Sequence, residues 1–144
     1  MKGIHISRVY EPPSPDDGTR LLVDRLWPRG MKKESLRLAG WLKEVAPSVS
    51  LCKWFGHDPV RWDEFRRRYC AELEKNPEAW RPVVQAAREG KVTLLFAARD
   101  VDHNNAVVLK GFLASKWQAR KVRQRGASPK ARAADGWRSG TGSG

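Results

Sequence analysis

The sequence predicts an α/β domain built on a small, mostly parallel sheet. Two runs are strand-like and lead directly into polar loops, Leu21 to Leu26 and Val92 to Ala98. The second run is almost continuously apolar, which is typical of a strand buried on both faces of a parallel sheet. Stretches with helical spacing separate the strand-like runs, and this alternation favours a layered α/β fold.

The chain has 144 residues, a length that suits one domain with a single core. We predict a single α/β domain over residues 1–123 and a basic, disordered tail over residues 124–144, where Gly, Ser, Ala and Arg dominate. Residues 115–144 hold eight Lys and Arg against one Asp, and so contribute +7 of the net charge of +12. Basic character therefore belongs mainly to residues 115–144, which include the tail and could bind nucleic acid non-specifically.

A first strand is expected at residues 3–10, where Ile4 and Ile6 alternate with polar residues. A loop with three prolines follows at residues 11–18, and the second strand occupies residues 19–26. The connection between these strands is short for a parallel crossover. An antiparallel pairing therefore remains an alternative at this point.

Four helices are expected, at residues 32–46, 58–75, 77–89 and 103–123. Ser35 is the N-cap expected for the first helix, and Asp58 followed by Pro59 is a strong start for the second. Gly90 closes the third. Residues 48–56 are read as either a helical turn or a short extended piece. The second helix carries an apolar stripe: Trp62, Phe65, Tyr69 and Leu73.

Polar loops follow both strand-like runs, and ligands bind outside the carboxyl ends of strands in open α/β sheets. Three arginines in these loops, Arg25, Arg29 and Arg99, could hold a phosphate or carboxylate through paired N–H donors. The alternative is structural, with Arg25 and Arg99 paired to Asp24 and Asp100.

Two histidines are candidates for acid/base chemistry. His57 precedes the predicted helix start at Asp58, where an anionic ligand would be attracted and a neutral imidazole favoured. His103 follows Asp100 and Asp102 at another helix start. Each could serve as a general base, or could simply cap or pack its turn. The two histidines and two aspartates could hold a metal ion if the loops converge, but no spacing requires one, and no metal site is predicted.

Trp27 and Trp54 could stack on a flat ligand or cover the edge of the core. The two cysteines, Cys52 and Cys70, lie in no metal-ligand or CxxC spacing and are expected to be buried free thiols. We find neither a secretory signal nor an apolar run of about 20 residues, and expect a cytoplasmic protein.

Three segments carry a resemblance to a known family: RVYEPPSPDDGTRLLVDRLWPRG, KWFGHDPVRWDEFRRRY and VTLLFAARDVDHNNAVVL. Over Gly3 to Leu113 the chain resembles the YeaO-like branch of a large bacterial family of uncharacterised proteins. The resemblance implies a small, mostly parallel, Rossmann-like sheet flanked by helices, with a shared polar site and no established reaction.

Longer members of that family, more remotely similar, suggest which residues form the shared site. Asp24, Arg25, Pro28 and Arg29 match their first motif, and Asp100 and His103 match their second. Cysteines in their second motif are replaced here, so thiol chemistry does not carry over to this chain. The replacing residues are Ala97, Ala98, Asn104 and Asn105.

We expect a domain that binds a small anionic ligand, such as a nucleotide or phosphoester, at the strand-end edge. Hydrolysis or group transfer there would use His57, His103 and Asp100. No cofactor is assigned, and the oligomeric state is left open. The alternatives are a nucleic-acid-associated adaptor that uses the basic tail, and a partner-binding regulatory domain without catalysis. The loops that carry Arg25 and Arg99 and the His57 turn are expected to line one pocket. The expected ligand-binding residues are Asp24, Arg25, Trp27, Arg29, Trp54, Arg99 and Asn104.

Overall fold

The computed structural model describes residues 3–126, with side chains as far as Trp117. It divides into two compact units, Met1–Leu113 and Ala114–Gly144, and the fold described here is that of the first. Most of the predicted tail, residues 127–144, lies outside the described part of the chain. Residues 124–126 are the end of a helix.

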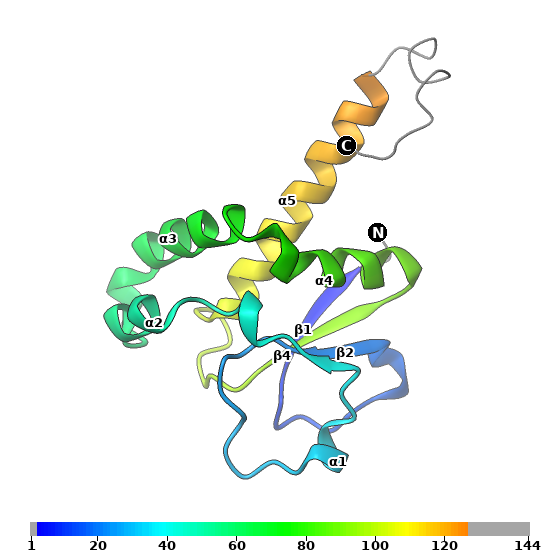
Figure 1. Cartoon of the computed structure of the whole chain (residues 1–144). Helices are drawn as coiled ribbons and strands as arrows, with labels where there is room; N and C mark the ends of the chain where they lie inside the picture. Colours follow the sequence, from blue (N-terminus) through cyan, green and yellow to red (C-terminus); the bar gives the residue numbers. More distant parts are fainter. Residues whose placement is uncertain (1–2, 127–144) are drawn as a thin grey trace. The chain divides into compact units, whose positions relative to one another are not determined.

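The sheet has four strands, and every neighbouring pair in it is parallel (Figure 1). The predicted α/β class is therefore confirmed. Both β1 and β2 pair with β4, so the antiparallel alternative for the first two strands is wrong. The strands stand in the order β1-β4-β2-β3, and they are β1 (Ile4–Arg8), β2 (Thr19–Leu22), β3 (Gly40–Trp41) and β4 (Val92–Phe96).

The short connection from β1 to β2 is fitted closely against β4. Gly18 precedes β2 with φ 66°, and a Cβ at this position would lie 2.2 Å from the carbonyl oxygen of Lys91. Only glycine avoids both that clash and the left-handed strain. Thr93 of β4 also donates its hydroxyl to the carbonyl of Asp17 at 2.7 Å. The connection can therefore pass β4 and enter the sheet on its far side.

The described residues contain five α-helices and three short 3-10 helices. The predicted start at Asp58 is confirmed, because its carboxylate accepts the N–H of Val60 and Pro59 follows it. Gly90 ends α4 with extended backbone at φ 175°, not in a left-handed conformation. No helix among residues 3–126 is long and apolar enough to cross a bilayer. The helices are α1 (Lys33–Leu36), α2 (Val49–Phe55), α3 (Trp62–Glu74), α4 (Pro77–Glu89), α5 (Asn105–Gly126), η1 (Pro15–Asp17), η2 (Lys43–Val45) and η3 (Pro59–Arg61).

The helix predicted at residues 32–46 is wrong. Helix α1 ends after Leu36, because Arg37 adopts a left-handed conformation at φ 49°. Ser35 lies inside α1 and is not its N-cap. Trp41 lies in β3 beside Leu22, so pairing with the open edge of β2 overrides the helical spacing. The segment at residues 48–56, which the sequence left open, contains α2, capped by the hydroxyl of Ser48.

Two further predictions need correction. The second strand ends at Leu22, although the N–H of Val23 still bonds to Leu95, and Leu26 is 78% exposed. The chain turns away there, so the predicted strand was too long. Neither cysteine is fully buried: Cys52 is exposed and Cys70 half-buried. The buried faces of α2 and α3 are formed by neighbouring aromatic and aliphatic residues instead.

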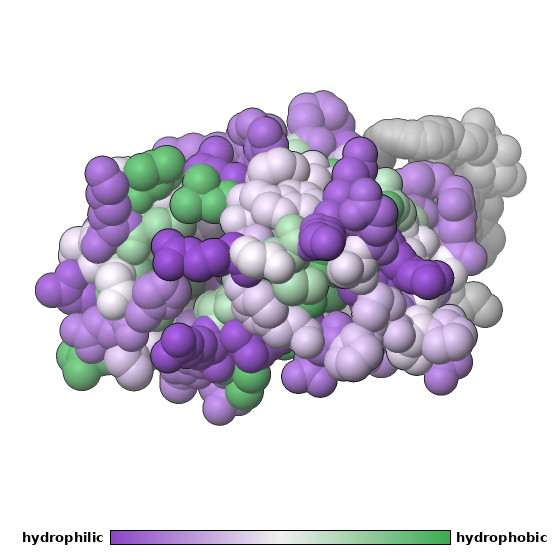
Figure 2. Space-filling model, turned by 90° about the horizontal axis from the view of Figure 1, so that it is seen from below, coloured by the Kyte–Doolittle hydropathy of each residue, from purple (hydrophilic) through white to green (hydrophobic). Residues whose placement is uncertain are grey.

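The two faces of the sheet are covered differently (Figure 1). Residues such as Leu21, Val23 and Leu94 face the helical layer, where α2, α3, α4 and the first turns of α5 supply the larger core. Leu22 and Leu95 face the opposite side, which is covered by α1 and irregular chain. Figure 2, seen from this side, shows mostly hydrophilic residues with hydrophobic ones in small separate areas. We call these the helix face and the loop face.

Candidate functional site

The loops that follow β2 and β4 are joined through Asp24. One oxygen of its carboxylate accepts the N–H of Ala97 at 2.9 Å, and the other accepts the side-chain amide of Asn105 at 3.1 Å. The same amide bonds to the carbonyl of Val23 at 3.0 Å. Burial raises the pKa of Asp24, against the effect of these two hydrogen bonds and of His57. The carboxyl ends of the two strands thus meet, as their parallel direction predicted.

Asp100 and His103 form a pair in the loop after β4. One Asp100 oxygen lies 2.9 Å from Nδ1 of His103, and the other accepts the backbone N–H groups of Asp102 and His103, each at 3.0 Å. The Asp102 N–H is the largest cause that lowers the pKa of Asp100. Because Nδ1 is occupied, Nε2 is the His103 nitrogen left to meet a ligand. The side chain of His103 is 34% exposed.

Asn104 holds the start of α5 and not a ligand. It is buried; its amide nitrogen donates to the carbonyl of Asp100 and its oxygen accepts the N–H of Val107. The amide of Asn105 is also engaged within the protein, at Val23 and Asp24, and it joins the start of α5 to the loop after β2.

His57 lies at the turn between α2 and η3, with its side chain exposed. Its backbone is left-handed at φ 57°, directly after Gly56 at φ 54°. A residue with a Cβ pays roughly 1 kcal/mol for this conformation, and such strain is concentrated at functional sites. The ring centroid lies 6.1 Å from that of Phe55.

Phe55 and Trp62 link the two histidines. Their ring centroids are 5.9 Å apart, and Trp62 meets the ring of His103 edge-on at 5.0 Å. His57 and His103 therefore contact the same aromatic pair, although they lie far apart in the sequence. We call Asp24, His57, Asp100, His103 and Asn105, with this aromatic pair, the strand-end cluster.

Arg25 points elsewhere. Its guanidinium donates to the carbonyls of Pro47 and Ala46, each at 3.3 Å, just before α2. Among the ion pairs of the described residues, none joins Arg25 to Asp24, or Arg99 to Asp100. The predicted ion pairs of Arg25 with Asp24 and of Arg99 with Asp100 are therefore wrong. Arg25 does have a structural role, through its bonds to the two carbonyls. Arg99 is exposed beside the strand-end cluster.

Arg25 also lines a cavity, and no lining residue of this cavity comes from the His57 turn or the Arg99 to His103 loop. It is therefore not the single pocket that the sequence led us to expect.

Trp27 and Arg29 belong to the loop face. Trp27 packs edge-on against Trp41 with centroids 5.3 Å apart, and its indole N–H donates to the carbonyl of Met31. Arg29 is exposed, and its carbonyl accepts the hydroxyl of Tyr10 at 3.1 Å. These two residues lie on the opposite face of the sheet from the aromatic pair of the strand-end cluster.

Trp54 is already in contact with cations of its own chain. The guanidinium carbons of Arg61 and Arg68 lie 5.2 and 4.3 Å from its ring centroid. A flat ligand would have to compete with these cation–π contacts.

Sequence reasoning missed three residues of the strand-end cluster and one residue beside it. Asn105 was noted only as a replacement for cysteine, Trp62 only as part of the core stripe, and Phe55 not at all. Trp41, beside the cluster, was placed in a helix. The indole of Trp41 donates to the carbonyl of Asp24 at 2.8 Å. An amide at a helix start beside a strand-end carboxylate is the signal that could have identified Asn105. Among the described residues, no three His, Cys, Asp or Glu side chains are placed to hold a metal ion.

The model of a family described as the inactive DUF488-N3 subclade matches residues 3–132. The chain belongs to this family. The uncharacterized protein YeaO of Escherichia coli is 42% identical over 112 residues, which are 78% of this chain and 97% of that protein. Uncharacterized proteins of Mycobacterium bovis and Mycobacterium tuberculosis are each 42% identical over 110 residues, which are 76% of this chain and 92% of each relative. No solved structure matches the chain significantly.

These matches confirm the resemblance to YeaO-like proteins of unknown function. They also extend it, because the family match continues past Leu113, where the recognised motifs end.

Proposed function

We propose that this domain binds a small anionic ligand, a phosphate ester or nucleotide, at the strand-end cluster and does so without catalysis. The observation that carries the proposal is the meeting of His57 and His103 on one aromatic pair at the carboxyl edge of a parallel sheet. This edge is where ligands bind in open α/β sheets.

The charge distribution supports an anion. The carboxylates of Asp24 and Asp100 are already satisfied by backbone and side-chain N–H groups. His57 and the exposed guanidinium of Arg99 still offer N–H donors, and His103, whose Nδ1–H is held by Asp100, offers a second N–H at Nε2 when its ring is protonated. Charge-assisted hydrogen bonds from such donors to phosphate oxygens are among the stronger polar interactions in proteins.

Two features favour binding over catalysis. The family is described as an inactive subclade. The resemblance to longer relatives implies cysteines at the positions of Asn104 and Asn105, and in this chain the amides of both residues are engaged in hydrogen bonds within the protein. Hydrolysis or group transfer is the alternative at the same site, where the pair of Asp100 and His103 would supply the acid/base group. The cytoplasmic location and nucleic-acid binding by the tail also stay predictions.

The three histidines of the chain provide a direct test by NMR. The imidazole signals are followed during titration with adenosine monophosphate, and separately with adenosine. We expect the monophosphate to shift the signals of His57 and His103 and to leave His5, at the start of the sheet, unchanged. Equal shifts at all three histidines, or none with millimolar ligand, would overturn the proposal.

Matched variants then measure the affinity by calorimetry. His57→Asn keeps a residue that tolerates the left-handed conformation, His103→Gln keeps a polar side chain, and His5→Gln is the control. We expect losses of at least about tenfold, or about 1.4 kcal/mol, for the first two and none for the control. Turnover of a phosphate ester by the wild type, abolished in His103→Gln, would instead support catalysis.

A further inference from the structure

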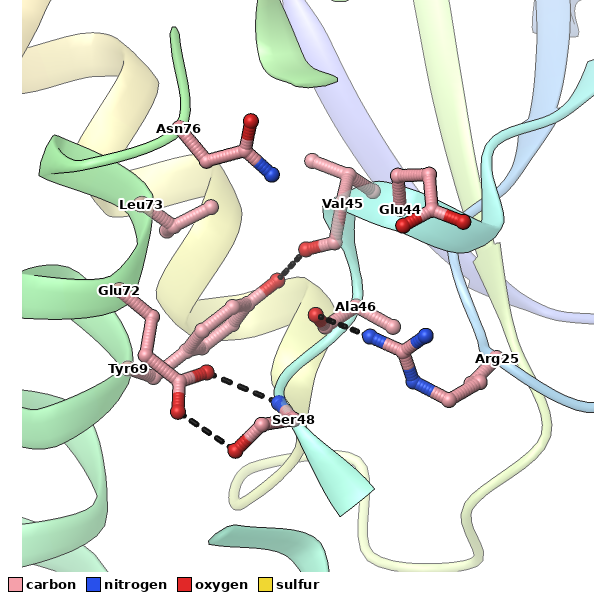
Figure 3. A pocket seen from close by; sticks show the side chains of 9 residues that line it. All are labelled: Arg25, Glu44, Val45, Ala46, Ser48, Tyr69, Glu72, Leu73 and Asn76. Atoms are coloured by element: carbon pink, nitrogen blue, oxygen red, sulfur yellow. Dashed lines mark hydrogen bonds between the residues drawn. The ribbon is translucent and has the colours of Figure 1, made fainter. Parts of the chain in front are cut away.

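A cavity of about 170 Å³ lies between α3, η2 and the segment that precedes α2 (Figure 3). None of its lining residues belongs to the strand-end cluster. Pockets for drug-sized ligands usually measure about 300 to 1,000 Å³, so this one suits a smaller molecule. The lining residues are Arg25, Glu44, Val45, Ala46, Ser48, Tyr69, Glu72, Leu73 and Asn76.

Part of the cavity wall is held by hydrogen bonds within the protein. The hydroxyl of Tyr69 donates to the carbonyl of Val45 at 2.6 Å. The Glu72 carboxylate accepts the backbone N–H of Ser48 at 2.8 Å and its hydroxyl at 2.6 Å. Arg25 donates to the carbonyl of Ala46 from one of its terminal nitrogens. These bonds join α3 to the segment before α2, so the cavity is preformed and a ligand need not order its wall.

Three groups of the lining are not engaged in this way. Within the described residues, no hydrogen bond or ion pair is made by the carboxylate of Glu44, the side-chain amide of Asn76 or the second terminal nitrogen of Arg25. Glu44 and Asn76 are both exposed, so the cavity opens to solvent. Figure 3 shows the Asn76 amide on one side and Glu44 and Arg25 on the other.

These groups combine both charges in one small space. Glu44 and Glu72 contribute two carboxylates, and Arg25 contributes one guanidinium. Glu44 and Arg25 line the same cavity without pairing with each other, which leaves each of them able to meet an opposite charge. Val45 and Leu73 supply an apolar wall beside them.

We propose that this cavity binds a free α-amino acid with a short aliphatic side chain. Its ammonium group meets the carboxylate of Glu44, and its carboxylate accepts N–H groups from Arg25 and Asn76. A zwitterion can pair with the charges of Glu44 and Arg25 at once, whereas a simple amine or a simple carboxylic acid can pair with only one of them. The inference is independent of anion binding at the strand-end cluster, because the two sites share no residue.

Calorimetric titration with L-alanine and L-valine tests the proposal, with propylamine and propionate as ligands that carry only one of the two charges. Binding of an amino acid is expected, with both single-charge analogues at least about tenfold weaker. Equal binding of propylamine would show a cation site and overturn the zwitterion. Lack of binding by any standard amino acid at millimolar concentration would overturn the site.

The variants Glu44→Gln and Asn76→Ala locate the binding. Both residues are exposed, so circular dichroism should show an unchanged fold. Glu34→Gln is the matched control, because Glu34 is an exposed glutamate on α1, away from the cavity lining. We expect at least about a tenfold loss of amino-acid affinity in the first two variants and none in the control. Unchanged affinity in Glu44→Gln would place the ligand elsewhere.

Discussion

The two faces of this sheet are stabilised in different ways. On the helix face, aromatic and aliphatic side chains from four helices pack into a continuous core around Phe65 and Tyr69. On the loop face, four hydrophobic residues of the described part of the chain form the buried cluster, and side chains donate to backbone carbonyls instead. Arg20 donates to Leu36 and Trp27 to Met31. The difference teaches that regular helices cover a sheet through apolar burial, whereas irregular chain needs specific polar contacts to stay in place.

The largest effect is expected on the helix face. Phe65 is 2% exposed, and its ring stacks on Phe55 with centroids 4.2 Å apart. Phe65→Ala removes the ring and leaves a cavity, so it should cost about 3 to 5 kcal/mol in the free energy of unfolding. Arg67→Ala is the control, because Arg67 lies on the exposed side of the same helix and bonds only to Glu64. Denaturant melts that give equal midpoints for the two variants would contradict the packing described here.

A smaller effect is expected on the loop face. Arg20 is 5% exposed; Nε donates to the carbonyl of Leu36 at 2.8 Å and Nη1 to the carboxylate of Asp17 at 2.6 Å. Arg20→Ala leaves the carbonyl of Leu36 without its donor and leaves the Asp17 carboxylate with the N–H of Ser14, so it should cost about 2 to 3 kcal/mol. The exposed Arg29 serves as control in the variant Arg29→Ala. If both variants melt at the same urea concentration, polar contacts do not hold this face.

The smallest effect depends on pH. The N–H of Ser14 and then the side chain of Arg20 lower the pKa of Asp17 below its ordinary value of 3.8. The charged carboxylate therefore stabilises the fold above that value, and this stabilisation is lost as the pH falls through the lower pKa of the folded state. The stability advantage of the wild type over Asp17→Asn should shrink in urea melts between about pH 5 and pH 2. A difference that stays constant over this range would show that Asp17 acts through its shape alone.

Local signals predicted those parts of the fold that depend on local sequence. The apolar run at Val92 gave a buried strand, and Asp58 with Pro59 gave a helix start. The strand order was not predictable in the same way, because the pairing of β1 and β2 with β4 joins residues far apart in the sequence. Residues 32–46 carry helical spacing, but the free edge of β2 competes for Trp41 and binds it as β3.

The candidate site also has features that the sequence predicted and features that it did not. The meeting of Asp24 with the loop after β4 follows from parallel strands that end at one edge, and was expected. The direction of the Arg25 side chain was not expected. Its guanidinium donates to the backbone carbonyls of Ala46 and Pro47, and backbone carbonyls cannot be recognised as acceptors from residue types in the sequence. Asn105 was missed for a related reason: its role depends on a carboxylate that lies far from it in the sequence.

The central position of β4 has a consequence for folding during synthesis on the ribosome. Among the strands of residues 3–126, β4 is the last to be synthesised, yet it is the only partner of β1 there and the partner of one whole edge of β2. Until Phe96 has emerged, β1 lacks its partner and β2 has only the two-residue β3 beside it, so their unpaired backbone groups and apolar side chains stay open to other chains. The nascent chain therefore completes its sheet in one late step, and the many distant pairings make this step slow for a small domain.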